Sequence, residues 1–438
     1  MTSDKLEVNA GVDQVDNLTD SQADNQANNH ANNDANEQDV LTRHVASTRF
    51  EAAREIGGLS ADNKFARVHG HGFLVSVHAE DNLLGSNSAA PAAAPAPAWP
   101  PYRGGEVPAM LGELQHLAQK LDYQRLNDVV PNPTDVQVAK WFGCQLSVPH
   151  LSAIALQSTP EQGVLVGMGV GVSADSDAGA DGQPSNRLLI WRRYRFQAAH
   201  QLPNVAPGHK CGRMHGHGFE VVLYAVSGDG LVDDAVNYTT LDAAWAQVAG
   251  QLSFQCLNDI PGLENPTSEL LSSWLWQRLK SVVPTLSAVT VYETASCGAT
   301  FDGERYRIWK DFSIDCAVRY RHAADVQDPR ARLHGYTYTL RLNLCAPLDD
   351  VMGWTVDFGD VKEVFNPVFK ALDHHPLHEN PEISAVSDGD TASMARWLFH
   401  KTQRMLPSMV RVDLFETEGC GASVGTDLQG PSLPLVRL

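Results

Sequence analysis

Two histidines separated by a single glycine, His215 and His217, are the residues whose types and spacing most directly suggest chemistry. Side chains alternate along a strand, so in an extended segment both imidazoles lie on the same face and can reach one ion. A third histidine, His200, ends residues 194–200, a run that alternates like a strand. If the two runs pair as neighbouring strands, three neutral imidazoles converge with no fourth protein ligand, which is the arrangement of a catalytic zinc site. We therefore expect Zn²⁺ at His200, His215 and His217.

Cys211 lies four residues before His215, near enough to act beside the metal. A histidine pair alone is weak support, because isolated histidines are usually polar surface or core residues. The longer pattern, Phe-x-Ala-Ala-His at 196–200 followed by Cys-x-x-x-His-Gly-His at 211–217, resembles the signature of the 6-pyruvoyl-tetrahydropterin synthase family. The three-residue gap after the cysteine is similar to that of the family's 6-carboxytetrahydropterin synthase branch.

The chain contains three related units, and this repetition defines its organisation. Histidine–glycine motifs occur at residues 69–73, 215–219 and 334–336. Apolar residues recur with the 3.6-residue helical period in 241–248 and 361–365. Within each unit the predicted order is two strands, two helices and then one or two strands. An antiparallel sheet with both helices on one side is an α+β unit.

The second helix of each unit has its own start signal. Asn-Pro-Thr at 132–134 and 265–267 supplies a capping residue and a proline for the first turn, and Asp390 with Thr391 replaces it in the third unit. The resemblance implies that each unit is a T-fold, and that three T-folds form a twelve-stranded β-barrel with the helices outside. The chain would then be a covalent pseudo-trimer.

Composition and the repeats together divide the chain into segments. Residues 1–40 are too poor in apolar side chains to order themselves, so we expect a disordered acidic tail there. The remaining segments are expected to be unit one at 41–170 with an Ala/Pro-rich insertion at 86–101, a linker at 171–187, unit two at 188–307 and unit three at 308–438.

The resemblance also implies a zinc site of three histidines, a cysteine base, an Asp-His pair from a neighbouring subunit, and a glutamate that anchors the pterin ring. Unit two offers the histidines, a cysteine and a glutamate: His200, His215, His217, Cys211 and Glu293. Unit three offers the Asp-His pair and a second glutamate: Asp373, His374 and Glu416. Each unit lacks what the other has. In unit two, Ser253 and Phe254 replace the Asp-His pair. In unit three, Val318 replaces the first metal ligand, Arg330 replaces the cysteine and Tyr336 replaces the last metal ligand.

These complementary losses predict one composite active site between units two and three, with Cys211 and His374 flanking a single substrate. Unit one keeps His69 and His71, but Arg54 at its third ligand position would repel a cation. Its cysteine, Asp-His and glutamate positions hold Phe65, Tyr123 and Gln157. The alternative is that the whole chain is a pseudoenzyme that keeps motif fragments for packing.

The resemblance implies a lyase, a zinc-dependent 6-carboxy-5,6,7,8-tetrahydropterin synthase acting on 7,8-dihydroneopterin triphosphate in the 7-deazaguanine (queuosine precursor) route. Cys211 would act as a base in its thiolate form, which a nearby Zn²⁺ favours, and His374, oriented by Asp373, would relay protons. Glu293 or Glu416 would accept two hydrogen bonds from the edge of the pterin. A 6-pyruvoyl-tetrahydropterin synthase and a non-catalytic pterin-binding scaffold remain alternatives.

Charge and composition exclude several other classes of protein. The net charge of −19 argues against a general nucleic-acid-binding protein, which would need a basic face. No apolar run reaches transmembrane length, the N-terminus lacks signal-peptide features, and seven scattered cysteines fit free thiols in a reducing compartment. We expect a cytoplasmic protein whose partners are a pterin triphosphate and, because the family's barrels usually stack in pairs, a second copy of the chain.

Overall fold

The computed structural model describes residues 40–81, 104–168, 188–228, 236–320, 328–386, 390–417 and 419–428. The predicted linker at 171–187, the Ala/Pro-rich insertion at 86–101 and, except for Val40, the predicted acidic tail lie outside the described residues.

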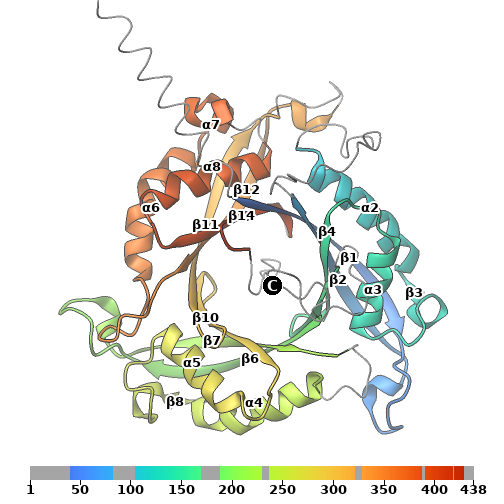
Figure 1. Ribbon diagram of the computed structural model, residues 1–438, viewed down its shortest axis with the longest axis horizontal. Helices are drawn as coiled ribbons and strands as arrows, with labels where there is room; N and C mark the ends of the chain where they lie inside the picture. The colour runs from blue at the N-terminus through green and yellow to red at the C-terminus, as the bar shows by residue number, and fades with distance from the viewer. Residues whose placement is uncertain are drawn as a thin grey trace, which may run out of the picture.

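The described strands form one closed β-barrel (Figure 1). Its wall consists of twelve antiparallel strands: β1 (Leu41–Arg54), β2 (His69–Asp81), β4 (Leu151–Thr159), β5 (Gln162–Gly167), β6 (Leu188–His200), β7 (His215–Val226), β9 (Leu286–Thr294), β10 (Cys297–Phe301), β11 (Tyr306–Val318), β12 (His334–Cys345), β13 (Met409–Thr417) and β14 (Cys420–Gly425). Two short strands, β3 (Gln124–Arg125) and β8 (Gln255–Cys256), pair in parallel with β1 and β6. The wall strands are hydrogen-bonded to their neighbours in the order β14-β13-β12-β11-β10-β9-β7-β6-β5-β4-β2-β1, and β14 pairs with β1 to close the ring.

The α-helices of the described residues lie outside the barrel (Figure 1). They are α2 (Glu106–Leu121), α3 (Asp135–Gln145), α4 (Tyr238–Leu252), α5 (Ser268–Leu279), α6 (Phe358–Leu372), α7 (Pro381–Val386) and α8 (Thr391–Gln403). Short 3-10 helices are η1 (Lys64–Ala66), η2 (Leu126–Asp128), η3 (Lys210–Gly212), η4 (Leu257–Asp259), η5 (Pro329–Ala331) and η6 (Leu377–Glu379). The order strand, strand, helix, helix, strand, strand occurs along each third of the chain, with α7 added in the last third. The closed antiparallel barrel with outer helices confirms the expected α+β architecture.

Each outer helix covers the barrel with an apolar stripe. In α6, Val361, Phe365, Val368 and Leu372 are buried at helical spacing. Phe365 packs against Phe312 of β11, with ring centroids 4.7 Å apart. Packing of this kind places the apolar core between the helices and the outer face of the barrel.

The opposite face of the strands carries charged residues toward the barrel interior. Asp311 immediately precedes Phe312 and therefore points to the other face of β11. Its carboxylate lies 2.8 Å from Nε of Arg341 on β12. Arg411 and Asp413 on β13 are also buried and lie 3.0 Å apart. Buried charges need such partners, so the barrel interior is lined in part by ion pairs.

The second helix of each third begins where the sequence predicts. The Thr134 hydroxyl caps α3 by accepting a hydrogen bond from the backbone N–H of Gln137. Thr267 caps α5 and Asp390 caps α8 in the same way. A capping residue is therefore found at all three predicted positions, but Pro133 and Pro266 precede the caps and do not lie in the first helical turn as predicted.

Two expectations drawn from composition can be compared with the structure. All seven cysteines lie in described segments and are free thiols. Among the helices in the described ranges, none is long and apolar enough to cross a membrane.

Candidate functional site

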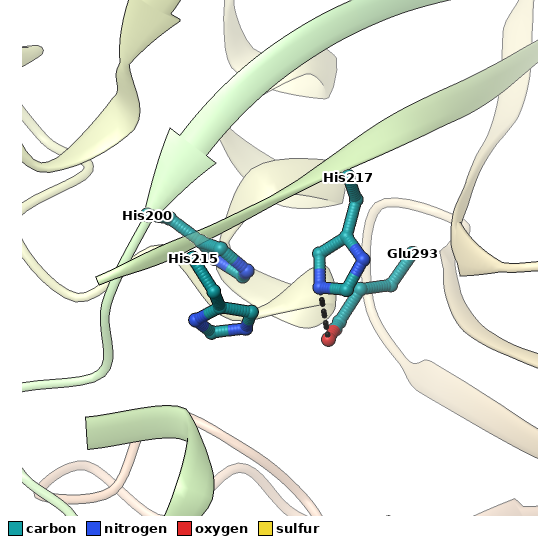
Figure 2. A group of neighbouring side chains, drawn as sticks. All are labelled: His200, His215, His217 and Glu293. Carbon is teal, nitrogen blue, oxygen red and sulfur yellow. Dashed lines mark ion pairs between the residues drawn. The ribbon is translucent and has the colours of Figure 1, made fainter. Parts of the chain in front are cut away.

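Three histidines converge at one end of strands β6 and β7. His200 stands opposite His215 in the strand register, and His217 follows on the same face of β7. Their ring centroids are 4.5 to 5.2 Å apart. Together with Glu293 at the end of β9, each offers a ligand atom within 4.8 Å of the others (Figure 2).

Backbone carbonyls hold two of the rings in a metal-binding orientation. Nδ1 of His200 lies 3.1 Å from the Pro266 carbonyl oxygen, and Nδ1 of His215 lies 2.8 Å from that of Arg213. A carbonyl partner at Nδ1 places the proton there and leaves Nε2 free to bind a metal. Nε2 of His200 and Nε2 of His217 are buried and have no hydrogen-bond partner among the described residues. Burial lowers the pKa of both imidazoles, which favours the neutral form that binds metals, so these residues fit a zinc ion.

Glu293 completes the group around the histidines. Its Oε1 lies 3.5 Å from Nε2 of His217, as the dashed line in Figure 2 marks. Its Oε2 accepts a hydrogen bond of 2.8 Å from the Ser268 hydroxyl at the start of α5. The sequence predicts Glu293 as a pterin anchor, whereas this position also allows it to be a fourth metal ligand.

A cavity of about 820 Å³ opens beside this group. One wall comes from the η3 loop, β7 and the start of α5; the other comes from residues 354–362 at the start of α6. Basic residues line it from the η3 loop, from β11 and from the start of α6: Lys210, Arg213, Lys310 and Lys362. Cys211 also lines it. Burial, and to a smaller extent the Glu293 carboxylate, raise the pKa of the Cys211 thiol, so a thiolate there needs a cation nearby.

Comparison with known proteins agrees with this geometry. The family model described as 6-pyruvoyl tetrahydropterin synthase matches residues 189–304 and again 307–427, which together are more than half of the chain. The chain belongs to the 6-pyruvoyl tetrahydropterin synthase family. The resemblance seen in the sequence motifs is therefore confirmed.

Individual relatives cover different shares of the chain. A 6-carboxy-5,6,7,8-tetrahydropterin synthase of Synechocystis is 36% identical over 127 residues, which are 27% of this chain and 95% of the relative. The 6-pyruvoyl tetrahydropterin synthase of Caenorhabditis elegans shares 17% identity, covering 26% of this chain and 92% of that one with a TM-score of 0.25. A uricase from Bacillus fastidious shares 12% identity over 67% of this chain and 90% of its own, with a TM-score of 0.23.

The Asp373–His374 pair of this family member lies away from the cavity. Asp373 ends α6, and the pair is held together at 3.0 Å between Asp373 Oδ2 and His374 Nδ1. Phe358 at the other end of α6 lines the cavity, and a 15-residue helix separates the two ends by roughly 20 Å. His374 instead donates its backbone N–H to Asp315 of β11, and its side chain is 75% exposed. The expectation that Cys211 and His374 of one chain flank one substrate must therefore be corrected: the folded path of α6 separates them.

Glu416 lies apart from the histidine group as well. It accepts a hydrogen bond of 2.9 Å from the Thr391 hydroxyl at the start of α8, as Glu293 does from Ser268. Burial raises its pKa. The neighbouring cavity is only about 30 Å³ and is lined by Arg330 and Tyr336. Of the two predicted pterin anchors, only Glu293 adjoins the three histidines.

The corresponding ligand position in the first third of the chain holds a buried ion pair instead of a histidine. Arg54, at the position of His200, lies 2.7 Å from Asp135, and both side chains are buried. Asp135 also accepts hydrogen bonds of 2.7 Å from Ser158 and from Tyr238 of α4. The Arg54 guanidinium takes the position of a third ligand beside His69 and His71, and the absence of a metal there stays a prediction.

The strand register also corrects one residue assignment in this third. Three residues beyond the second motif histidine, β2 pairs with Gln157 and β7 pairs with Tyr292. Gln157 is therefore equivalent to Tyr292, and Ser158 is equivalent to Glu293. The assignment of Gln157 to the glutamate position is wrong by one residue, because repeat spacing does not reveal which residues pair across strands.

Sequence reasoning missed a second carboxylate in the main cavity. Glu269 lines it, is almost fully buried, and accepts a hydrogen bond of 2.8 Å from the backbone N–H of Thr355. Burial raises its pKa to about 7. Aligning the three second-helix starts would have identified it, because the other two thirds carry Val136 and Ala392 there.

Proposed function

We propose that this chain is a zinc-dependent 6-carboxy-5,6,7,8-tetrahydropterin synthase with one active site per chain, acting on 7,8-dihydroneopterin triphosphate in the 7-deazaguanine precursor route. The observation that carries the proposal is the convergence of His200, His215 and His217 at a cavity that also contains Cys211. The Synechocystis relative and the three-residue spacing between Cys211 and His215 favour this activity over that of a 6-pyruvoyl tetrahydropterin synthase.

The charges of the cavity suit a pterin triphosphate. Four basic side chains line it and can neutralise several phosphate charges, because Lys and Arg both bind phosphate oxygens. The carboxylates of Glu293 and Glu269 lie in the same cavity. A carboxylate can accept two hydrogen bonds from the guanidine-like edge of a pterin, so these two residues are the candidates to hold the ring.

The chemistry would be divided among a few side chains. His200, His215 and His217 would hold the zinc ion, which when bound supplies Lewis-acid polarisation of the substrate's side-chain hydroxyls. Cys211 would take a proton from the adjacent carbon once a neighbouring cation has favoured its thiolate. Glu293 would keep the ring fixed while the proton is transferred.

We also propose that the chain is a pseudo-trimer of T-fold units at 41–170, 188–307 and 308–438. The last strand of each unit pairs with the first strand of the next: β5 with β6, β10 with β11, and β14 with β1. The repeated element order and the two copies of the family model support this division. Among the described residues, three converging histidines then occur only at the interface between units two and three.

A second copy of the chain would supply the missing proton relay. Tyr123, Phe254 and His374 occupy equivalent positions after the first helix of each unit, and each donates its backbone N–H to the first strand of that unit. Tyr123 and Phe254 are 82% and 83% exposed. They lie at the end of the barrel at which β6 ends with His200. A copy stacked on this end would cover both side chains. It would also bring its Asp373 and His374 to the partner's cavity.

The proposed activity is tested by incubating the purified, zinc-loaded chain with 7,8-dihydroneopterin triphosphate and identifying the products by mass. We expect 6-carboxytetrahydropterin, with no product from Cys211→Ala. A 6-pyruvoyl product would establish the alternative enzyme. A protein that binds no zinc and forms no product would overturn the proposal in favour of a pterin-binding scaffold.

A further inference from the structure

His209 connects the loop that carries Cys211 to the start of α6. Its Nδ1 accepts a hydrogen bond of 3.2 Å from the backbone N–H of Cys211. Because Nδ1 is an acceptor, the neutral ring carries its proton on Nε2. Nε2 lies 3.4 Å from Oδ2 of Asp357, in the next unit. Both side chains line the main cavity beside Cys211.

The turn that contains His209 does not itself need a histidine. Asn63 and Asp328 hold the same position in the other units, as N-caps of η1 and η5. Each accepts a hydrogen bond from the backbone N–H two residues further on, as His209 does. Asn and Asp are favoured caps and imidazole is not. What the histidine adds is a second nitrogen that reaches across to Asp357.

Asp357 is in turn held rigidly. It is the N-cap of α6, and its Oδ1 accepts a hydrogen bond of 2.5 Å from the backbone N–H of Gly359. This leaves Oδ2 for His209. The segment before it is attached to unit two as well, because Thr355 donates to Glu269 and the Thr267 hydroxyl donates to the Gly353 carbonyl. A contact to Asp357 therefore fixes its partner against a well-anchored wall.

We propose that His209 and Asp357 are positioning residues for Cys211, a clamp that holds the cysteine loop against the cavity wall supplied by unit three. The proposal rests on the proposed function for its kinetic consequences. A clamp is needed because the cysteine must be held close to the reacting atom: a displacement of about 1 Å can lower the rate about 100-fold. Lys210 and Arg213, on the same loop, also line the cavity, so the clamp would set their positions together with the cysteine.

The chain offers variants that separate the clamp from the cap. His209→Asn keeps the cap, as Asn63 shows, and loses the reach to Asp357. We expect its kcat to fall about tenfold or more, with KM within about twofold and zinc content unchanged. His209→Gln, whose amide offers an acceptor and a donor, should retain most of the wild-type kcat. Asp357→Asn keeps a favoured helix cap and should match His209→Asn.

Coupling and controls make the test specific. The double variant of His209→Asn and Asp357→Asn should be no slower than the slower single variant, because both remove one contact. His116→Asn and Asp360→Asn are matched exposed controls on α2 and α6 and should leave kcat unchanged. Losses that multiply in the double variant would overturn the clamp. A His209→Gln variant as slow as His209→Asn would also overturn it, because it would indicate proton transfer by the imidazole.

A second readout does not depend on turnover. The alkylation rate of Cys211 by iodoacetamide in the zinc-loaded protein, followed by peptide mass, should rise severalfold in His209→Asn and stay unchanged in His116→Asn. If the wild-type protein fails to consume 7,8-dihydroneopterin triphosphate, the proposed function fails, and the alkylation rates still decide the clamp. Equal alkylation rates in wild type and His209→Asn would overturn it.

Discussion

At the scale of single residues, the histidine group is organised by the partners of the ring nitrogens. Carbonyl oxygens near Nδ1 of His200 and His215 leave Nε2 of each ring for a metal. In unit one, Arg54 takes the place of the buried ligand and Asp135 neutralises it. Two substitutions, Arg54 for the histidine and Asp135 at the position of Ser268, therefore separate the histidine group from the buried ion pair.

We predict one zinc ion per chain. His200→Ala should lose the metal, because it removes the buried ligand between two others. His69→Ala should leave the content unchanged, because Arg54 already occupies the third ligand position of unit one. Elemental analysis of the purified variants measures this directly. Three zinc ions per chain, or metal loss in His69→Ala, would contradict the one-site interpretation.

Glu269 gives the stability of the protein a specific pH dependence. Burial raises its pKa from 4.5 to about 7, so between these values the folded chain holds a proton that the unfolded chain has released. The free energy of unfolding therefore decreases as pH rises through this window, by up to roughly 3 kcal/mol. Glu269→Gln removes the titrating group. The free energy of unfolding of this variant, relative to wild type, should therefore be higher at pH 8 than at pH 5. Denaturant unfolding at the two pH values measures the difference, and a constant difference would contradict the raised pKa.

At the scale of elements, α6 explains why residues 354–362 line the cavity and why Asp373 and His374 do not. Its N-terminal end and the preceding residues form the second wall of the cavity. Its C-terminal end carries Asp373 and His374. Since a helix is rigid over this length, both ends of α6 cannot meet the same substrate, and we have proposed that the pair serves the cavity of a second copy.

The junction between α3 and α4 gives a prediction at the same scale. Asp135 at the start of α3 is bonded by Arg54, and Tyr238 at the start of α4 donates to it across the boundary between units one and two. Asp135→Asn should destabilise the fold by about 3 kcal/mol or more, because it leaves the buried guanidinium without a counter-charge. Denaturant unfolding measures the loss, while zinc content should not change.

A compensating variant tests the cause of that loss. Adding Arg54→Met to Asp135→Asn removes the unpaired charge and should recover part of the stability. A double variant as unstable as Asp135→Asn alone would show that Arg54 is not the reason.

At the scale of the whole molecule, ring closure determines which surfaces remain free. In the proposed pseudo-trimer each unit has both neighbours within the chain, because β14 pairs with β1. The end of the barrel that carries Tyr123 and Phe254 is exposed, and this is the surface on which a second copy would stack. We expect light scattering to give twice the 47.7 kDa chain mass, and Phe254→Glu to give the monomer because it buries a charge in that contact.

Complementation tests whether His374 acts on the partner's cavity. Cys211→Ala and His374→Ala should each be inactive alone. When the two are unfolded and refolded together, mixed dimers contain one intact site, so about a quarter of wild-type activity should return. Activity that stays absent in dimers shown to be mixed would contradict a relay supplied by the second copy.

Features that depend on local spacing could be predicted from the order of the amino acids. The two-residue alternation of a strand put His215 and His217 on one face, and capping chemistry placed the helix starts at Thr134 and Thr267. Free thiols and the repeated order of elements also followed from local patterns.

Which distant residues share a cavity became visible only in the folded chain. Closure of the barrel brings residues 354–362 against unit two and buries Glu269, while α6 carries His374 away from the histidines. The strand register moved one assignment from Gln157 to Ser158. Backbone geometry repeats every few residues, whereas contacts between distant segments depend on how the strands close into one barrel and how the helices pack on it, which no local spacing encodes.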